Sequence, residues 1–238
     1  HLGDRHQPSP NAGTCAKPDV SVKDAPSSNT EKIVIAKKAK FFVGGEMNSW
    51  FNVRIPAAGG DKKQVLLVRY GGTRKLGGVQ IWSVPAVHSN GINATFLKGD
   101  IAKHMKDNGL TAYVGPPGGY VLRFSNGLTV YLSGDTGVTA EQEIVVRKSL
   151  GAKLVVMNIG GIFSTGPKEA AFVINELVKP NAVIISHANE EATKGGKIRP
   201  KTKTEAFQKM VSVPSYPSLS GITMEFDSDA KCIKGCSM

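Results

Sequence analysis

The stretch that decides the fold lies near the middle of the chain and reads Leu128-Thr129-Val130-Tyr131-Leu132-Ser133-Gly134-Asp135-Thr136-Gly137. An apolar, strand-like run ends there at one carboxylate, Asp135, which is flanked by small residues. Small neighbours let a metal ion approach the backbone, and a carboxylate in that position can bridge two cations. Taken alone, however, the same residues are typical of a turn in which the aspartate caps a following helix.

Two histidines follow strand-like runs in the same manner. His88 comes after the run at 79–87, and His187 comes after the run at 182–186. A single histidine at a strand end is usually a structural, hydrogen-bonded residue. Strand ends in an α/β protein share one edge of the sheet, so we expect both imidazoles to meet Asp135 there. Imidazole and carboxylate together are ligands typical of zinc or manganese.

The remaining pattern predicts an α/β protein with a mixed sheet, folded as a single domain over residues 1–238. Residues 6–31 are expected to form a long Pro-rich loop, and residues 227–238 a C-terminal tail. Gly-Gly pairs between the runs at 64–70 and 79–87 predict a hairpin. Further strands are expected at 112–114, 120–124, 128–132, 154–157, 182–186 and 220–226, and helices at 33–39, 100–108, 139–150, 167–178 and 204–211.

Composition narrows the class of protein. With 40% hydrophobic and 21% charged residues the chain is typical of a soluble globular protein, and no apolar run approaches the ~18 residues of a membrane span. The net charge of +11 is compatible with a solvated basic surface, with attraction of an anionic substrate or envelope polymer, or with nucleic-acid binding. No zinc-finger, RNP-like or basic-zipper pattern accompanies the charge, so the sequence does not favour nucleic acid.

Three cysteines occur, Cys15, Cys232 and Cys236. The last two are four positions apart, a spacing that a small disulfide loop can close, and no histidine lies near them to make a zinc site. A disulfide forms in an oxidising compartment, so we expect a periplasmic or secreted protein, with a cytoplasmic location as the alternative.

Taken together, these segments resemble the metallo-β-lactamase superfamily, in particular the branch of ascorbate-6-phosphate lactonase-like and other metal-dependent hydrolases. The resemblance runs from His1 to about Phe207, and no single segment of it is specific. Its ordered series comprises His1-Leu2-Gly3-Asp4, Ala86-Val87-His88-Ser89, Gly118-Gly119-Tyr120-Val121, Tyr131-Leu132-Ser133-Gly134-Asp135-Thr136-Gly137, Asn158-Ile159-Gly160-Gly161, Thr165-Gly166-Pro167-Lys168-Glu169-Ala170-Ala171, Ile184-Ile185-Ser186-His187 and Glu205-Ala206-Phe207.

The resemblance implies an αββα sandwich with mixed sheets and a centre of two zinc ions, for which manganese is an alternative. In that centre His88 would belong to the first metal site, His1 and His187 to the second, and Asp135 would bridge both as the catalytic carboxylate. Asp4 would support the His1 segment from outside the ligand set. His1-Leu2-Gly3-Asp4 resembles the end of a longer motif, so we expect a chain that lacks N-terminal strands and three ligands, or whose N-terminal part is a separate piece.

The function implied is that of a metal-dependent hydrolase, in which a metal-activated water attacks a small, anionic ester, lactone or phosphodiester. Lys194, Lys197 and Arg199 are candidates for contact with the substrate, because their basic segment follows His187 closely. His6, in the Pro-rich loop, is a further candidate. The oligomeric state is left open.

Two other classes of function are compatible with parts of the sequence. A non-catalytic binding protein on a degraded hydrolase scaffold would account for the missing ligands. A secreted copper enzyme could chelate the metal through the amino group and imidazole of His1, but it would need a partner histidine and a mostly antiparallel sandwich.

Overall fold

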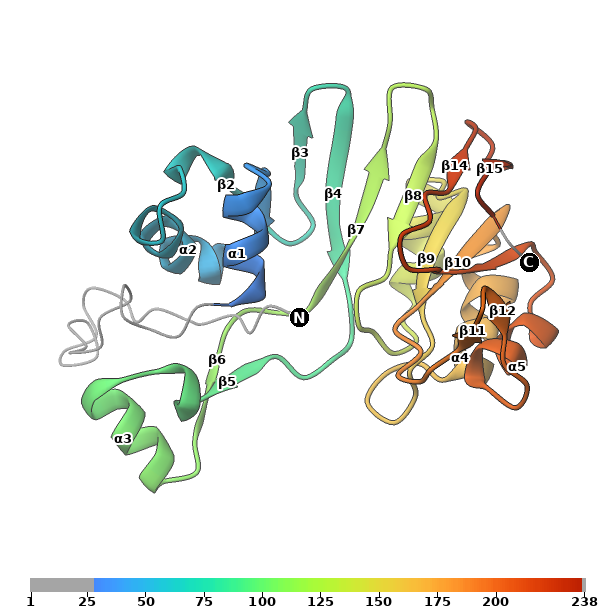
Figure 1. The fold of residues 1–238 in the computed structure, drawn as a ribbon. Helices are drawn as coiled ribbons and strands as arrows, with labels where there is room; N and C mark the ends of the chain where they lie inside the picture. Colours follow the sequence, from blue (N-terminus) through green and yellow to red (C-terminus); the bar gives the residue numbers. More distant parts are fainter. Residues whose placement is uncertain (1–27, 237–238) are drawn as a thin grey trace. The chain divides into compact units, whose positions relative to one another are not determined.

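The structure, a computed structural model, describes residues 28–236. The chain divides into two compact units (Figure 1). The described part of the first comprises residues 28–69 and 89–116, and that of the second comprises residues 70–88 and 117–236. Every predicted site residue within the described range belongs to the second unit.

The second unit is built on a seven-stranded sheet with the order β13-β10-β9-β8-β7-β4-β3. Strands β8, β9, β10 and β13 pair in parallel, whereas β3, β4 and β7 add to β8 through antiparallel pairs. β4 therefore runs in the same direction as β8, and the carboxyl ends of β4, β8, β9 and β10 share one edge. The strands span Thr73–Leu76 (β3), Val79–Pro85 (β4), Gly118–Arg123 (β7), Thr129–Leu132 (β8), Leu154–Asn158 (β9), Ala182–Ser186 (β10) and Ser215–Pro217 (β13).

Helices cover one face of this sheet. They are η4 (Gln142–Ser149), α4 (Pro167–Phe172), its continuation η5 (Val173–Val178) and α5 (Lys203–Met210). Val155 and Met157 of β9 belong to the core beneath that layer, together with the fully buried Phe207 of α5. Because β9 and β10 are covered on both faces, their sequences are apolar throughout rather than alternating.

The opposite face of the same sheet packs against the end of the chain. Leu154 and Ala182 form a core there with Tyr216 and Ala230. β14 (Glu225–Phe226) pairs antiparallel with β15 (Cys232–Lys234), and a disulfide joins Cys232 to Cys236. The predicted disulfide is thus confirmed, and residues expected as a tail contribute a strand and part of a core.

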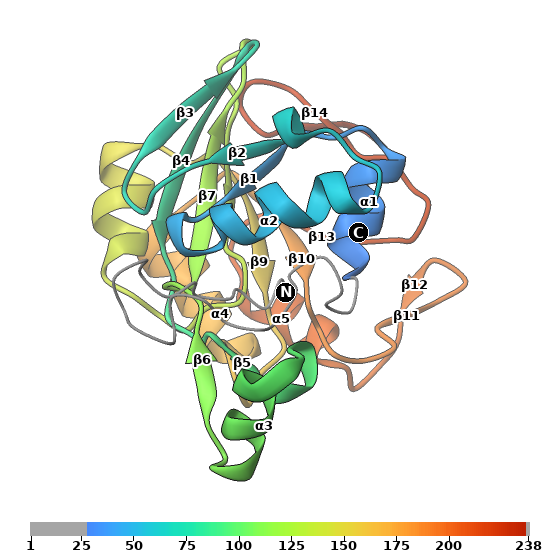
Figure 2. The same cartoon turned by 90° about the vertical axis from the view of Figure 1, so that its left-hand side faces the viewer.

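The first unit contains helices α1 (Asn29–Ala36), α2 (Gly45–Ala57) and α3 (Gly99–Asp107), and short 3₁₀ turns η2 (Lys62–Gln64) and η3 (Ala94–Phe96). β1 (Phe41–Val43) pairs in parallel with β2 (Val65–Leu67), and β5 (Gly91–Asn93) pairs antiparallel with β6 (Thr111–Tyr113). The packing of α1 and α2 beside β1 and β2 is visible in Figure 2. Among the described residues, no helix has the length and apolar character needed to cross a bilayer.

Several sequence-based expectations differ from the structure. The hairpin expected between 64–70 and 79–87 is wrong, because β2 pairs with β1 and the partner of β4 is β3. All four residues of β3 are exposed and two of them are Arg74 and Lys75, so β3 lacks the apolar signal of a strand.

The expected final strand at 220–226 is reduced to β14, and β13 was missed because it is a short edge strand that ends at Pro217. The last residues of the expected 6–31 loop belong to α1, which Ser28 caps.

Candidate metal centre

Three strand ends bring His88, Asp135 and His187 together. His88 follows β4, Asp135 follows β8 and His187 directly follows β10. The Nε2 atom of His88 lies 3.9 Å from Oδ2 of Asp135, and the Nε2 atom of His187 lies 3.3 Å from the same oxygen. The Asp135 side chain is 7% exposed, against 15% for His88 and 36% for His187. The carboxylate therefore lies at the bottom of this group and the two imidazoles above it.

The loop that carries Asp135 is fixed by a buried polar network. The Ser133 hydroxyl donates to Oδ1 of Asn158 at 3.1 Å, and the Asn158 side-chain amide donates to the Thr136 carbonyl at 3.1 Å. Thr165 adds two bonds, from its hydroxyl to the Asn158 carbonyl at 2.8 Å and from its amide to the Thr136 carbonyl at 3.0 Å. All four side chains are at most 2% exposed, so the network resists displacement of the loop.

The same loop also positions His88. The amide of Val87 donates to the Thr136 hydroxyl at 3.0 Å, and the amide of Gly137 donates to the Val87 carbonyl at 2.8 Å. These two bonds join the end of β4 to the residues that follow Asp135, across the intervening strand β7. Thr136, fully buried, is therefore the residue that holds the His88 and Asp135 segments in register.

His187 lies in a closely packed loop. Its backbone has a φ of 49°, in the left-handed region that non-glycine residues rarely occupy. A Cβ added to Gly160 would lie 3.0 Å from Nδ1 of His187 and 2.8 Å from its carbonyl oxygen, so only glycine fits there. The Lys203 ammonium donates to the carbonyls of Gly160 at 2.5 Å and Ala188 at 3.3 Å, and it thereby joins the loops on both sides of the imidazole.

The sequence had placed Asn158, Gly160 and Thr165 in its ordered series but gave them no role, and it gave none to Lys203 by itself. Each acts through contacts with residues remote in the chain, so no local pattern indicated their function. The one signal in the sequence that could have indicated a supporting role is at Asn158, where a polar residue comes directly after an all-apolar run and is buried.

The remaining predicted site residues are not seen at this centre. Lys194 and Lys197 lie on the hairpin of β11 (Thr193–Lys194) and β12 (Lys197–Ile198), both exposed. Arg199 is exposed and forms an ion pair with Glu191. His1, Asp4 and His6 lie outside the described residues.

The donors present fit zinc or manganese by chemical type, since two imidazole nitrogens and a carboxylate oxygen converge from three rigid strand ends. Between residues 28 and 236, however, no group of three or more His, Cys, Asp or Glu side chains is arranged to hold a metal ion. The described residues thus supply part of a donor set and do not complete a metal site by themselves.

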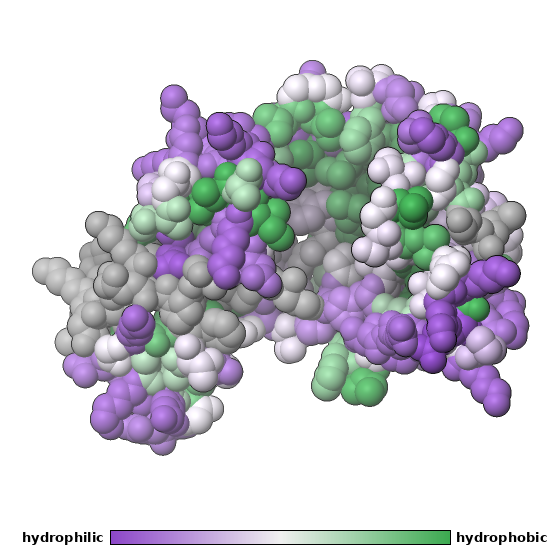
Figure 3. All heavy atoms as spheres, viewed as in Figure 1, coloured by the Kyte–Doolittle hydropathy of each residue, from purple (hydrophilic) through white to green (hydrophobic). Residues whose placement is uncertain are grey.

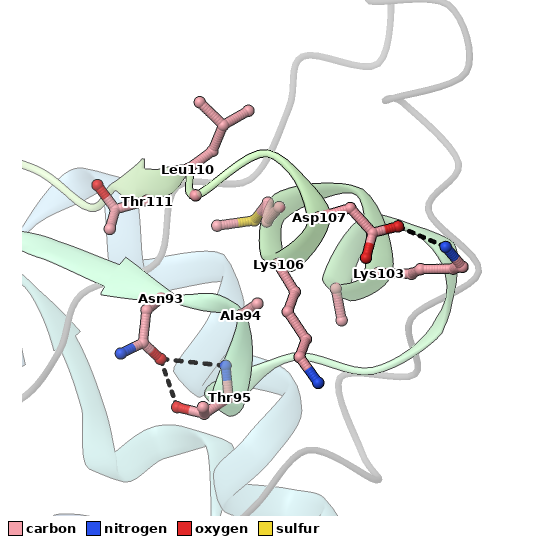
Figure 4. A pocket seen from close by; sticks show the side chains of 11 residues that line it. Asn93, Ala94, Thr95, Lys103, Lys106, Asp107, Leu110 and Thr111 are labelled. Carbon is pink, nitrogen blue, oxygen red and sulfur yellow. Dashed lines mark hydrogen bonds and ion pairs between the residues drawn. The ribbon is translucent and has the colours of Figure 1, made fainter.

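A separate pocket of about 730 Å³ lies in the first unit, between η3, α3 and the start of β6. Figure 4 shows Lys103 paired with Asp107, and the Thr95 amide bonded to the Asn93 side chain, in the lining of this pocket. Its lining contains no histidine or cysteine and a single carboxylate, and that carboxylate is paired with Lys103. This pocket lacks the donors of a metal-dependent reaction.

No family model matches the chain. A UPF0173 metal-dependent hydrolase of Roseiflexus sp. (strain RS-1) is 31% identical over 142 residues, which are 60% of this chain and 50% of that protein. A second UPF0173 metal-dependent hydrolase, from Koribacter versatilis, is 30% identical over 159 residues, 66% of this chain and 59% of that protein. The matches thus span only about half to three fifths of these relatives.

Among solved structures, Igni18, described as a novel metallo hydrolase of the archaeon Ignicoccus hospitalis, superposes with a TM-score of 0.55. The match covers 80% of this chain and 70% of that one at 21% identity, a level that shows a common fold. The mixed sheet, the strand-end histidines around Asp135 and the relatives in sequence agree with the resemblance found in the sequence. The chain is thus similar in sequence to UPF0173 metal-dependent hydrolases and shares the fold of a metallo hydrolase.

Proposed function

We propose that the protein to which this chain belongs is a metal-dependent hydrolase whose reaction takes place at His88, Asp135 and His187. The observation that carries the proposal is the approach of both imidazole Nε2 atoms, at 3.9 and 3.3 Å, to one buried carboxylate oxygen. The names of the relatives in sequence support the same class of reaction.

A bound zinc or manganese ion would act as a Lewis acid and would lower the pKa of a bound water toward ~7. His88 and His187 would hold metal through Nε2, and Asp135 would bridge two ions in the complete protein, with His1 as a further ligand and Asp4 behind it. The buried network of Ser133, Asn158 and Thr165 keeps the Asp135 loop fixed, which preserves the geometry that ligands require. Burial of the carboxylate also strengthens its interaction with a cation, because little water screens it.

Removal of metal tests the proposal directly. The protein is stripped with a chelator and assayed on a p-nitrophenyl ester, a lactone and a bis(p-nitrophenyl) phosphate, before and after addition of Zn²⁺, Mn²⁺ or Mg²⁺. We expect hydrolysis of at least one substrate to fall by at least about 100-fold on stripping and to return with Zn²⁺ or Mn²⁺, since imidazole ligands suit these ions better than Mg²⁺.

Hydrolysis that survives chelation would contradict the proposal. Tight metal or substrate binding without turnover would instead favour the non-catalytic binding protein, which the incomplete donor set of the described residues also allows. The copper-enzyme alternative is not supported by the fold, because β8, β9, β10 and β13 are parallel whereas that class needs a mostly antiparallel sandwich.

The substrate that we propose is small and anionic, and it is attracted by the β11–β12 hairpin. Lys194 and Lys197 face each other on this hairpin and are exposed, so their charges are available to an anion. Replacing both by Ala is expected to raise KM for an anionic ester severalfold and to leave a neutral analogue nearly unchanged. The effect should shrink with added salt, because exposed charges are screened over ~8–10 Å.

Lys75→Ala with Lys231→Ala is the matched control, since it removes the same charge from two other exposed positions of the second unit. Arg199→Ala should have less effect than either lysine, because Glu191 already neutralises its guanidinium. Equal losses on the anionic and the neutral substrate would show that the hairpin only supports the local fold.

We also propose that the protein is located in an oxidising compartment, the periplasm or the exterior of the cell. The Cys232–Cys236 disulfide supports this, because such bonds are rare in proteins of the reducing cytosol.

A further inference from the structure

The loop between β9 and α4 ends in two adjacent apolar side chains that face solvent. Ile162 is 91% exposed and Phe163 is 81% exposed, the highest values among the exposed large hydrophobic side chains of the described chain. Hydrophobic atoms project in Figure 3 at the place that this loop occupies in Figure 1. Single exposed apolar residues are common, but two large ones side by side at a loop tip indicate a contact surface.

The backbone of the same tip is held in an unfavourable conformation. Ile162 has a φ of 60°, which is rare for any residue other than glycine and rarer still for a β-branched one. The amide of Phe163 donates to the Gly161 carbonyl at 2.7 Å and closes a three-residue turn around Ile162. Such strain persists where surrounding structure enforces it, and it is concentrated at functional sites.

Both ends of the loop are anchored in the candidate metal centre. Gly160 packs against the His187 imidazole, and Thr165 donates to the carbonyl of Thr136, the residue after Asp135. Ile162 lies two residues from Gly160 and Phe163 two residues from Thr165, so each Cα atom lies within about 7 Å of its nearer anchor. Val87, beside His88, and Val138, three residues after Asp135, are also exposed, at 59% and 41%. Exposed apolar residues thus lie near His88 and Asp135 in the chain, and the loop tip is anchored beside His187.

We infer that Ile162 and Phe163 determine substrate specificity by covering an apolar group that is attached to the hydrolysed bond. The inference rests on the proposed function and narrows its substrate class to an ester, lactone or phosphodiester with an alkyl or aryl part beside the reacting centre. The turn at Ile162 presents both side chains outward, and the anchors at Gly160 and Thr165 fix the distance between the apolar contact and the site.

The test compares substrates that differ only in chain length. The metal-loaded protein and the variant Ile162→Ser with Phe163→Ser are assayed on p-nitrophenyl acetate and p-nitrophenyl hexanoate. We expect kcat/KM for the hexanoate to fall about tenfold in the variant and that for the acetate to change less than about twofold, because each methylene in contact with an apolar surface adds to affinity.

Ile222→Ser with Ile233→Ser is the matched control, since it removes two exposed isoleucines, 52% and 65% exposed, from another part of the same unit. It should leave the ratio of the two rates unchanged. The alternative is that Ile162 and Phe163 contact a second copy of this chain. Analytical ultracentrifugation of the parent chain and both variants tests it. A dimer that dissociates in the Ile162/Phe163 variant alone would overturn the inference.

A binding experiment separates failure of the inference from failure of the proposed function. Calorimetric titration with hexanoate and acetate anions is carried out alongside the assay. Hexanoate binding that the variant loses, without turnover of any ester, would support the apolar contact and contradict the hydrolase. Turnover with equal losses on both esters would overturn the inference and leave the hydrolase standing.

Discussion

Replacing Asp135 by Asn is expected to lower the affinity of the protein for Zn²⁺ or Mn²⁺ by at least about 100-fold, and to lower hydrolysis by about 1000-fold, or about 4 kcal/mol. Both histidines approach the carboxylate of Asp135, and an amide keeps the shape of this group but removes its charge. The centre would then hold the metal through neutral imidazoles alone. Competition with a chromophoric chelator measures the affinity, and the substrate panel measures the rate.

Asp229→Asn serves as the control, because Asp229 is an exposed carboxylate of the same unit that pairs with Lys153. It should leave metal affinity within about twofold of the parent, since an exposed pair contributes little. Far-UV circular dichroism of both variants checks that the fold is retained. Unchanged metal affinity in the Asp135 variant would show that the carboxylate caps a loop and binds no metal.

Replacing Glu31 by Ala is expected to destabilise the first unit by about 3–5 kcal/mol, because it removes one partner of a buried ion pair. Both oxygens of Glu31 accept from Arg54, at 2.6 Å from Nε and 2.9 Å from Nη2, and the two side chains are 2% and 4% exposed. Glu31 also accepts from the Ser28 amide at 2.7 Å and completes the capping box of α1. The variant loses the cap and leaves the Arg54 guanidinium buried without this carboxylate.

The loss of stability is measured by urea unfolding, followed by the fluorescence of Trp50. Trp82, the other tryptophan of the chain, lies in the second unit and is replaced by Phe, so that the signal reports on the first unit alone. Trp50 is 6% exposed and lies 6.0 Å from the Arg54 guanidinium, so its emission responds to this region. The double variant Glu31→Leu with Arg54→Leu should recover most of the loss, because two apolar residues need no charge compensation. A double variant as unstable as Glu31→Ala would mean that packing, and not charge, dominates here.

The sequence predicted those parts of the structure that depend on neighbouring residues. The strands expected at 120–124 and 128–132 are confirmed as β7 and β8. The four-residue spacing of Cys232 and Cys236 indicated their disulfide. His88, Asp135 and His187 could be placed at strand ends because each comes within a few residues of an apolar run, and strand ends of one direction share an edge. Their role as metal ligands stays a prediction.

Only the tertiary structure decided how these elements are paired and how the centre is supported. β4 pairs with the exposed, charged β3 and not with residues 64–70, because strand pairing is settled by the whole sheet and not by local hydrophobicity. Asn158 reaches Ser133 across 25 positions, and Lys203 reaches Gly160 across 43. The left-handed turn at Ile162 likewise follows from its anchors at Gly160 and Thr165. The local sequence therefore determines which side chains stand at the strand ends, whereas long-range contacts determine where those side chains are held.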